Sequence, residues 1–288
     1  MLVDRIGRSA HNAPMLLTRA PGLSLRPFVR SMWAADASPI GKAASGAFLR
    51  EHVLPTGDMH LVFRLSGPPL RLFADAVDSV GYTVGHAIVG GARSAFYARD
   101  VSVATCSVGV QLRPGAARAL FGVPADELAE RHAPLDALWG AHASEVLERL
   151  HEAGMPAARL TLLEDLLNER LKPQPHAMHP AIAQALLQLG NGATVSDLVD
   201  AGGYSHRRFI ALFRDAAGLP PKRLERVLRF QRVMAADPAR GNLPWADLAL
   251  QSGYSDQPHF NRDFLEITGM TPQAYRRASP NSPNHVPG

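Results

Sequence analysis

Side chains that can hydrogen-bond to the edges of nucleic-acid bases gather near the C-terminus of the chain. Glutamine and asparagine suit bidentate contacts to adenine, and arginine suits the same kind of contact to guanine. One group of such residues comprises Gln257, His259, Asn261 and Arg262. A second group, about fifty residues earlier, comprises Ser205, His206, Arg207, Arg208, Ile210, Ala211 and Arg214. Together they offer base-edge hydrogen bonds, phosphate contacts and an apolar surface for a thymine methyl group.

Both groups lie in a segment that occurs twice. Gly203-Tyr204-Ser205 recurs as Gly253-Tyr254-Ser255, and Phe213 recurs as Phe264. Such a repeat indicates one supersecondary unit used twice. A helix, a glycine turn and a second helix predict helix-turn-helix units at residues 193–217 and 243–268. The offset is 50 at Gly203/Gly253 and 51 at Phe213/Phe264, so the second unit has one extra residue near Pro258.

The elements around the repeat must hold these side chains in place. Ser205 is expected to cap the second helix of the first unit, and Ser255 or Asp256 that of the second. A basic helix over Lys222–Ala236 is expected to join the units, about one DNA turn (roughly 34 Å) apart. In this helix we expect Arg226 and Arg229 to pack or to form ion pairs. Asp263 would repel phosphate, so we expect it to orient a basic neighbour.

The first part of the chain has the pattern of strands. Met59, Leu61 and Phe63 alternate with polar or smaller residues, which is typical of a half-buried strand. Several other short alternating segments, separated by Gly, Pro, Asp and Ser, predict an antiparallel barrel or sandwich. After Pro114 the period becomes helical, with an amphipathic helix expected to begin at Pro156.

These patterns predict an α+β chain with two domains. Residues 1–172 are expected to form a sensor or dimerisation domain that is rich in strands and ends in helices. Residues 173–178 contain prolines and are expected to be a linker. Residues 179–278 are expected to form an all-α domain with the two helix-turn-helix units, and residues 279–288 a disordered tail.

Four polar residues of the N-terminal domain are candidates for ligand binding. Arg50 and His52 share one strand face, and His60 and Arg64 share another. If both faces line a barrel interior, they could bind an anion or a metal; the interpretation we favour is an outward polar face. The single cysteine, Cys106, is interpreted as a buried and inert thiol rather than a redox sensor.

Composition excludes several classes of protein. The chain has 288 residues, a net charge of +4, 46% hydrophobic residues and 19% charged residues, which fits a globular protein. No apolar run reaches the roughly 18 residues of a membrane helix, and the N-terminus lacks the apolar core of a signal peptide. One cysteine permits no internal disulfide and no cysteine-based zinc site. Phosphate-loop and nucleophile-elbow motifs are absent, so neither an enzyme nor a cofactor or metal is expected.

The C-terminal hundred residues resemble the AraC/XylS class of bacterial transcription regulators. The second unit carries the resemblance, over Ala249, Gly253-Tyr254-Ser255-Asp256, Phe260, Arg262, Phe264, Gly269, Thr271-Pro272 and Tyr275-Arg276. The N-terminal half resembles the sensor-like domains that precede such modules, over Leu54–Phe63 and Gln111–Ala116. The resemblance implies a cupin-like strand-rich domain, helices after it, and a DNA-binding function. Since no membrane span and no signal-peptide core are found, we expect the chain to be cytoplasmic.

We therefore expect a sequence-specific transcription regulator whose N-terminal domain responds to a ligand or partner. Double-stranded promoter DNA is the expected partner; RNA polymerase, a small-molecule effector and a second copy are further candidates, and no membrane contact is expected. Two alternatives remain open: an enzyme or small-molecule-binding domain fused to a DNA-binding module, and a helical protein-interaction adaptor. A further hypothesis is that the second unit reads bases while the first anchors on phosphates.

Overall fold

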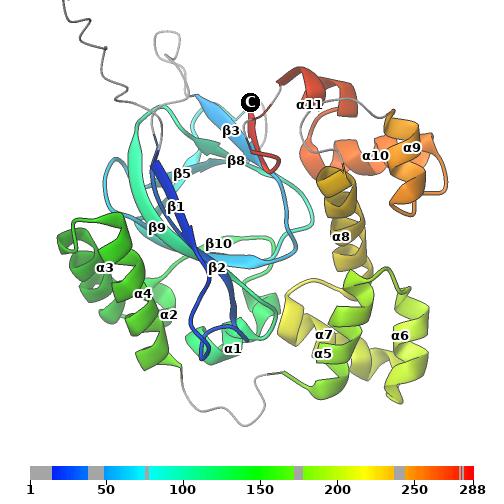
Figure 1. Cartoon of the computed structure of the whole chain (residues 1–288), viewed down its shortest axis with the longest axis horizontal. Helices are drawn as coiled ribbons and strands as arrows, with labels where there is room; N and C mark the ends of the chain where they lie inside the picture. Colours follow the sequence, from blue (N-terminus) through cyan, green and yellow to red (C-terminus); the bar gives the residue numbers. More distant parts are fainter. Residues whose placement is uncertain are drawn as a thin grey trace, which may run out of the picture.

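The computed structural model describes residues 15–37, 49–74, 78–171, 178–236, 244–278, 280 and 282–288. A strand-rich N-terminal half lies beside a helical C-terminal half (Figure 1). The expected α+β class, with strands first and helices after, is confirmed. The expected linker lies outside the described residues, apart from Met178.

The N-terminal half contains two antiparallel sheets. The six-stranded sheet has the order β1-β2-β9-β4-β7-β10, and the five-stranded sheet has the order β11-β3-β8-β5-β6. The strands of the first sheet are β1 Met15–Arg19, β2 Val29–Ala37, β9 Thr105–Leu112, β4 Met59–Arg64, β7 Ala87–Gly90 and β10 His132–Pro134. Those of the second are β11 His285–Pro287, β3 Arg50–Val53, β8 Tyr97–Asp100, β5 Leu70–Phe73 and β6 Tyr82–Gly85.

Helices cover one face of the six-stranded sheet. They are α1 Ala116–Phe121, the 3-10 turn η1 Ala125–Glu127, α2 Asp136–Trp139, α3 His142–Glu152 and α4 Pro156–Arg170. Helix α4 begins with proline at its first position, as expected, because proline there loses no helical hydrogen bond. Its buried face, with Leu160, Leu163 and Leu167, shares one apolar core with Met59 and Leu61 of β4.

The described residues of the C-terminal half are organised as helices up to residue 278. Its helices are α5 Pro180–Gly190, α6 Val195–Gly202, α7 His206–Ala217, α8 Pro221–Ala236, α9 Trp245–Gln251, α10 Gln257–Thr268 and α11 Pro272–Ala278. The pairs α6–α7 and α9–α10 form the two helix-turn-helix units, and α8 joins them (Figure 1). Ser205 caps α7 by accepting the backbone N–H of Arg208, and Asp256 caps α10 by accepting that of His259.

The expectation of a disordered tail at residues 279–288 was wrong for its last residues. Strand β11 pairs antiparallel with β3, and the Val286 side chain is completely buried. In Figure 1 this short red strand lies against the sheet of the N-terminal domain. A segment poor in core-forming residues is ordered here because β3 offers an edge of unpaired backbone groups.

The apolar cores do not follow the domain boundary. One core joins the N-terminal domain to the first helix-turn-helix unit and includes Leu61, Ala125, Phe209 and Phe213. A second core belongs to the second unit and includes Leu54 of the N-terminal domain together with Val286 of β11. The two halves are therefore packed together as one structure.

Candidate nucleic-acid interface

Helix α10 presents its polar side chains to solvent because two phenylalanines fix its orientation. Phe260 and Phe264, one helical turn apart, are completely buried. The intervening positions point away from the core, so Gln257, Asn261 and Arg262 are exposed. Three of the four residues predicted to read bases are thus accessible on this helix.

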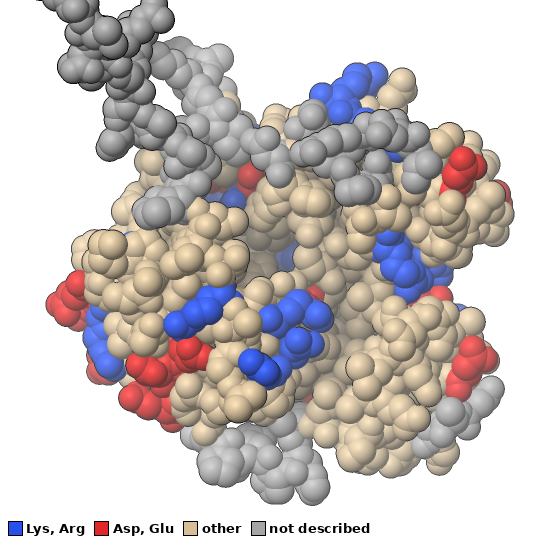
Figure 2. Space-filling model, in the orientation of Figure 1, with Lys and Arg blue, Asp and Glu red and all other residues tan. Residues whose placement is uncertain are grey.

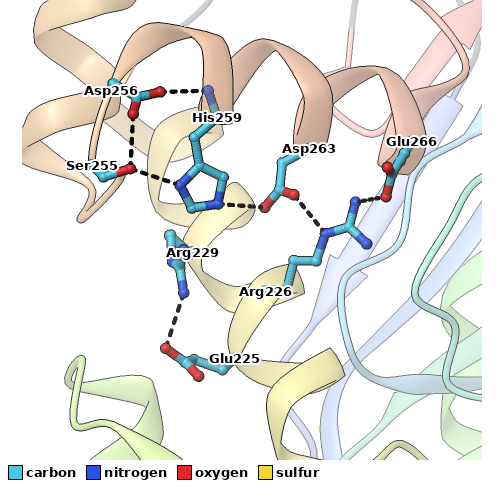
Figure 3. A network of polar contacts seen from close by, with 8 residues as sticks. All are labelled: Glu225, Arg226, Arg229, Ser255, Asp256, His259, Asp263 and Glu266. Atoms are coloured by element: carbon cyan, nitrogen blue, oxygen red, sulfur yellow. Dashed lines mark hydrogen bonds and ion pairs between the residues drawn. The ribbon is translucent and has the colours of Figure 1, made fainter.

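The fourth, His259, is half-buried and takes part in a polar network that fastens α10 to α8 (Figure 3). Its Nδ1 lies 3.1 Å from Ser255 Oγ, and its Nε2 lies 3.9 Å from the Asp263 carboxylate. Asp263 in turn forms a 2.9 Å ion pair with Nε of Arg226 on α8, and Arg226 also pairs with Glu266. Asp263 therefore faces a basic neighbour, as expected from the sequence, and holds the recognition helix against the linking helix.

The second arginine of α8 that we expected to form an ion pair also does so. Arg229 pairs with Glu225 at 3.0 Å on the same helix, and its guanidinium lies 5.2 Å from the ring of Tyr254. Figure 2 shows basic side chains gathered between the two helix-turn-helix units, where α8 passes. The charges of Arg226 and Arg229 are balanced by neighbouring carboxylates, and their geometry is fixed within the domain.

Helix α7, like α10, is oriented by two phenylalanines that face the core. Phe209 and Phe213 are completely buried, as the spacing predicts. The residues proposed from the sequence lie elsewhere on the helix: His206, Arg207, Arg208, Ala211 and Arg214 are exposed, and Ile210 is half-buried.

The surface of α7 differs from that of α10 because the N-terminal domain docks on it. Arg118 of α1 makes a two-pronged hydrogen bond to the Asp215 carboxylate, and the backbone N–H of Gly115 donates to the carbonyl of Ala216 at 2.8 Å. Asp126 of η1 forms a 3.3 Å ion pair with Arg214. The groove between them is lined by Pro124, Asp126, Arg207, Ile210, Ala211, Arg214 and Asp215.

A recognition helix must be clear of protein on the face that enters the DNA major groove, which is about 12 Å wide. Four of the predicted contact residues of α7 instead line a groove whose other wall is η1. In contrast, the contacts that described residues of the N-terminal domain make with α10 lie at the C-terminal end of this helix. There the Phe96 N–H donates to the Ile267 carbonyl at 2.7 Å, and His52 Nδ1 lies 3.3 Å from the Thr268 carbonyl. The structure thus leaves the second reading face open and the first partly covered.

The four ligand-binding candidates do not form one site. Arg50 covers the ring of Phe73 at 4.1 Å, while His52 stacks on Phe96 at 4.3 Å, facing the second helix-turn-helix unit. Arg64 is buried and donates to the Pro68 carbonyl at 3.1 Å, and burial lowers its pKa to about 10. His60 points between the two sheets.

Residues that the sequence did not single out surround His60. The ring of His132 lies 5.6 Å from that of His60, and the ring of Tyr97 lies 4.4 Å from that of His132. Gly90 of β7 pairs with both histidines, one on each neighbouring strand. A Cβ at Gly90 would lie 2.1 Å from Nε2 of His60, so the glycine makes room for the two rings. Only the pairing of the strands reveals this group.

The two histidines predict a pH dependence of stability. Burial and the charges of Arg99 and Arg93 lower the pKa of His60 to about 4; burial and the charge of His60 lower that of His132 to about 2. Below pH 6.5, the ordinary pKa of a histidine, the unfolded chain binds more protons than the folded chain. The free energy of unfolding should therefore fall, by about 1.4 kcal/mol per pH unit for each imidazole.

Urea denaturation between pH 7.5 and 4.5 measures this slope. His132→Asn should make the slope shallower, and His206→Asn, which removes an exposed imidazole from the first turn of α7, is the matched control. A slope that is identical in wild type and His132→Asn would contradict the assignment.

Cys106 differs from the buried thiol that we expected. Its side chain is half-exposed, and Nη1 of Arg159 lies 2.8 Å from its sulfur. Cys106 lies near the beginning of β9, where helix α4 leaves part of its side chain accessible.

Two family models match separate parts of the chain. Residues 182–278 match a family described as a helix-turn-helix domain, and residues 17–134 match a domain of unknown function (DUF6597). Over 103 residues the chain is 33% identical to the RCS-specific HTH-type transcriptional activator RclR of Escherichia coli (strain K12). The C-terminal domain is a helix-turn-helix domain of the AraC/XylS type. The resemblance drawn from the sequence is confirmed for this domain.

The alignment with RclR covers 34% of this chain and 36% of that protein, so the chain spans about a third of the length of this curated relative. Among solved structures, ToxT from Vibrio cholerae O395 is similar over 82% of this chain and 96% of its own, with 13% identity and a TM-score of 0.44. Wild-type ToxT from Vibrio cholerae strain SCE256, in a structure with a bound unsaturated fatty acid, is also similar. The similarity covers 93% of this chain and 97% of that one, with 12% identity and a TM-score of 0.45.

None of the described helices is long and apolar enough to cross a membrane.

Proposed function

We propose that the chain is a transcription regulator that binds double-stranded promoter DNA in the cytoplasm and is controlled through its N-terminal domain. One observation carries the proposal: two recognition helices, α7 and α10, are held by one continuous helix. Helix α8 has 16 residues and is therefore about 24 Å long, which is of the order of one turn of B-DNA. No enzymatic activity is proposed.

The two units are proposed to contribute differently to DNA recognition. On α10, Gln257, Asn261 and Arg262 are exposed and have the side chains that suit base edges. On α7, Arg207 and Arg208 suit phosphate contacts, and the apolar Ile210 and Ala211 suit a thymine methyl group. RNA polymerase and a second copy of the chain are further partners in this proposal, because the relative RclR is a transcriptional activator.

Regulation is proposed to act through the contact between α7 and the N-terminal domain. The carboxylate of Asp126 pairs with Arg214 and lies in the groove beside the reading face of α7. DNA phosphates and this carboxylate therefore compete for the same basic side chain and the same space. A signal that separates η1 from α7 would free the first unit by shifting an existing equilibrium.

The proposal is tested by measuring binding to DNA fragments selected from the source genome, in gel-shift experiments at increasing salt. The affinity should fall steeply with salt, because each phosphate contact releases condensed counterions. Binding that is equally strong at low and high salt, or equal for selected and random DNA, would reject the proposal and favour a protein-interaction role.

The covered first unit leads to a second prediction. The double variant Arg118→Ala and Asp126→Ala removes two ion pairs across the contact without changing the DNA-binding domain. Both pairs are partly exposed, so each contributes up to about 1 kcal/mol, and operator affinity should rise by about threefold to tenfold. Fluorescence anisotropy with labelled operator DNA measures this affinity. Arg149→Ala with Asp165→Ala, in α3 and α4, is the matched control; unchanged or weaker binding by the test variant would contradict regulation by docking.

A further inference from the structure

Strand β11 is held by elements of both domains. On one side it pairs antiparallel with β3, and the Gly288 N–H donates to the Arg50 carbonyl at 2.9 Å. On the other side, the Tyr275 hydroxyl of α11 donates to the Pro283 carbonyl at 2.9 Å. Figure 1 shows β11 between β3 and α11. Residues 282–288 therefore occupy a site that has one wall in each domain.

The centre of this site is an apolar socket for one side chain. Val286 is completely buried, and it shares an apolar core with Leu54 of the N-terminal domain and with Phe230 of α8. Alternate residues of a strand point to opposite faces, so the neighbouring His285 and Pro287 are more exposed. A single β-branched side chain thus supplies the apolar anchor of the segment.

A buried carboxylate lies beside the socket. Glu51 on β3 is 6% exposed, and it accepts from Arg99 at 2.6 Å and from His285 at 3.0 Å. Although burial acts to raise it, the hydrogen bond of His285 and the charge of Arg99 lower the pKa of Glu51 to about 2. The carboxylate is therefore ionised at neutral pH, and a buried ionised group needs partners. The site thus favours a strand that has a donor side chain at this position.

The segment that fills the site is weakly anchored. Residues 282–288 have the sequence Ser-Pro-Asn-His-Val-Pro-Gly, without Leu, Ile, Met or an aromatic residue, and their ladder with β3 is three residues long. The two prolines lack an N–H group and cannot donate a backbone hydrogen bond. Segments with few buried apolar contacts open locally, well below the free energy of global unfolding. The site can therefore empty and refill while the rest of the chain stays folded.

We propose that the site bounded by β3, Leu54, Phe230 and Tyr275 is a peptide-binding site. Residues 282–288 fill it in this structure, and an extended segment of another protein with the same chemistry can take their place. Backbone hydrogen bonds to the edge of β3 supply affinity, while the socket and Glu51 supply specificity. The preferred peptide is extended and has a donor side chain, such as histidine, followed by valine.

Occupation of the site fastens the second helix-turn-helix unit to the N-terminal domain, whichever chain supplies the peptide. One backbone hydrogen bond reports on this contact, because the Phe96 N–H donates to the Ile267 carbonyl of α10 at 2.7 Å. When the site is empty, this bond should open more often. The peptide site does not rest on the proposed function, and it is tested without DNA.

Binding is measured by fluorescence anisotropy, with the full-length protein and a labelled, end-blocked peptide that has the sequence of residues 282–288. Val286→Asp should bind this peptide at least tenfold more tightly than the wild type, in which β11 fills the site. Val103→Asp is the matched control, because Val103 is 51% exposed, and it should behave as the wild type does. Peptides that themselves carry Val286→Asp or His285→Glu should bind at least tenfold more weakly, since each places a carboxylate in the socket or beside Glu51.

Amide hydrogen exchange on the same proteins measures the contact between the domains. Exchange at Phe96 should be at least tenfold faster in Val286→Asp than in the wild type, and added peptide should slow it again. The Arg113 N–H donates to the Phe28 carbonyl at 2.8 Å within the N-terminal domain, and it should stay protected throughout. If the melting temperature shows that Val286→Asp does not fold, His285→Glu replaces it in both measurements.

A folded variant that binds the peptide no better than the wild type, or binds the altered peptides equally well, would overturn the proposal. Exchange at Phe96 that neither the substitution nor the peptide changes would do the same. A wild-type dimer that Val286→Asp converts to a monomer in sedimentation would also contradict it, because residues 282–288 would then be exchanged between two copies of this chain.

Discussion

Arg262→Ala is expected to weaken binding to the operator by tenfold or more and to relax the sequence preference at one base pair. The side chain is exposed on the open face of α10, beside Gln257 and Asn261. A bidentate arginine contact to guanine contributes about 1–3 kcal/mol of discrimination. Fluorescence anisotropy on the operator, and on variants with each base pair changed, measures both effects.

The control for this experiment is Arg149→Ala, which removes the same charge from the surface of α3 in the N-terminal domain. It should leave the affinity within about twofold, because long-range charge effects are screened beyond about 10 Å at 0.1 M salt. If Arg262→Ala bound as tightly as the control, α10 would not read DNA through this residue, and the main site assignment would be wrong.

Phe264→Ala is expected to destabilise the second helix-turn-helix unit by about 3–5 kcal/mol, the usual cost of emptying a phenylalanine site in a core. The ring is completely buried and lies within 6 Å of the rings of Phe230, Trp245, Phe260 and Tyr275. It therefore joins α8, α9, α10 and α11. DNA binding should be lost together with the structure of this unit.

Urea denaturation followed by circular dichroism measures this change. Leu265→Ala provides the matched control, because Leu265 is the next residue on α10 and is 49% exposed. The control should change the free energy of unfolding by less than about 1 kcal/mol. Similar losses for the two variants would mean that Phe264 does not anchor the unit.

The helices of the C-terminal domain could be predicted because their signals are local. The spacing of Phe260 and Phe264 decides which face of α10 is buried, and this alone places Gln257, Asn261 and Arg262 outside. The helix caps at Ser205 and Asp256 could likewise be predicted from a few neighbouring residues. Periodicity and capping act within one or two turns, so a single sequence is sufficient to detect them.

Contacts between distant segments could not be predicted in the same way. Asp126 meets Arg214 and Arg118 meets Asp215 across the domain boundary, and no local pattern indicates that these residues pair. His60 and His132 come together only because both strands pair with Gly90. We had favoured an outward polar face for His60, because alternation shows that a strand has two faces but not what each one meets.

Strand β11 also changes what kind of movement is available to the DNA-binding domain. The chain enters this domain from α4 and returns to β3, so the domain is fastened to its neighbour at both of its ends. The domain is therefore not free to move about a single connection. It can rotate about an axis through its two attachments, or the hydrogen bonds between β11 and β3 can break. Because both attachments stay within one chain, re-docking is an intramolecular event at a high effective concentration. The switch should therefore have the same midpoint in dilute and in concentrated protein.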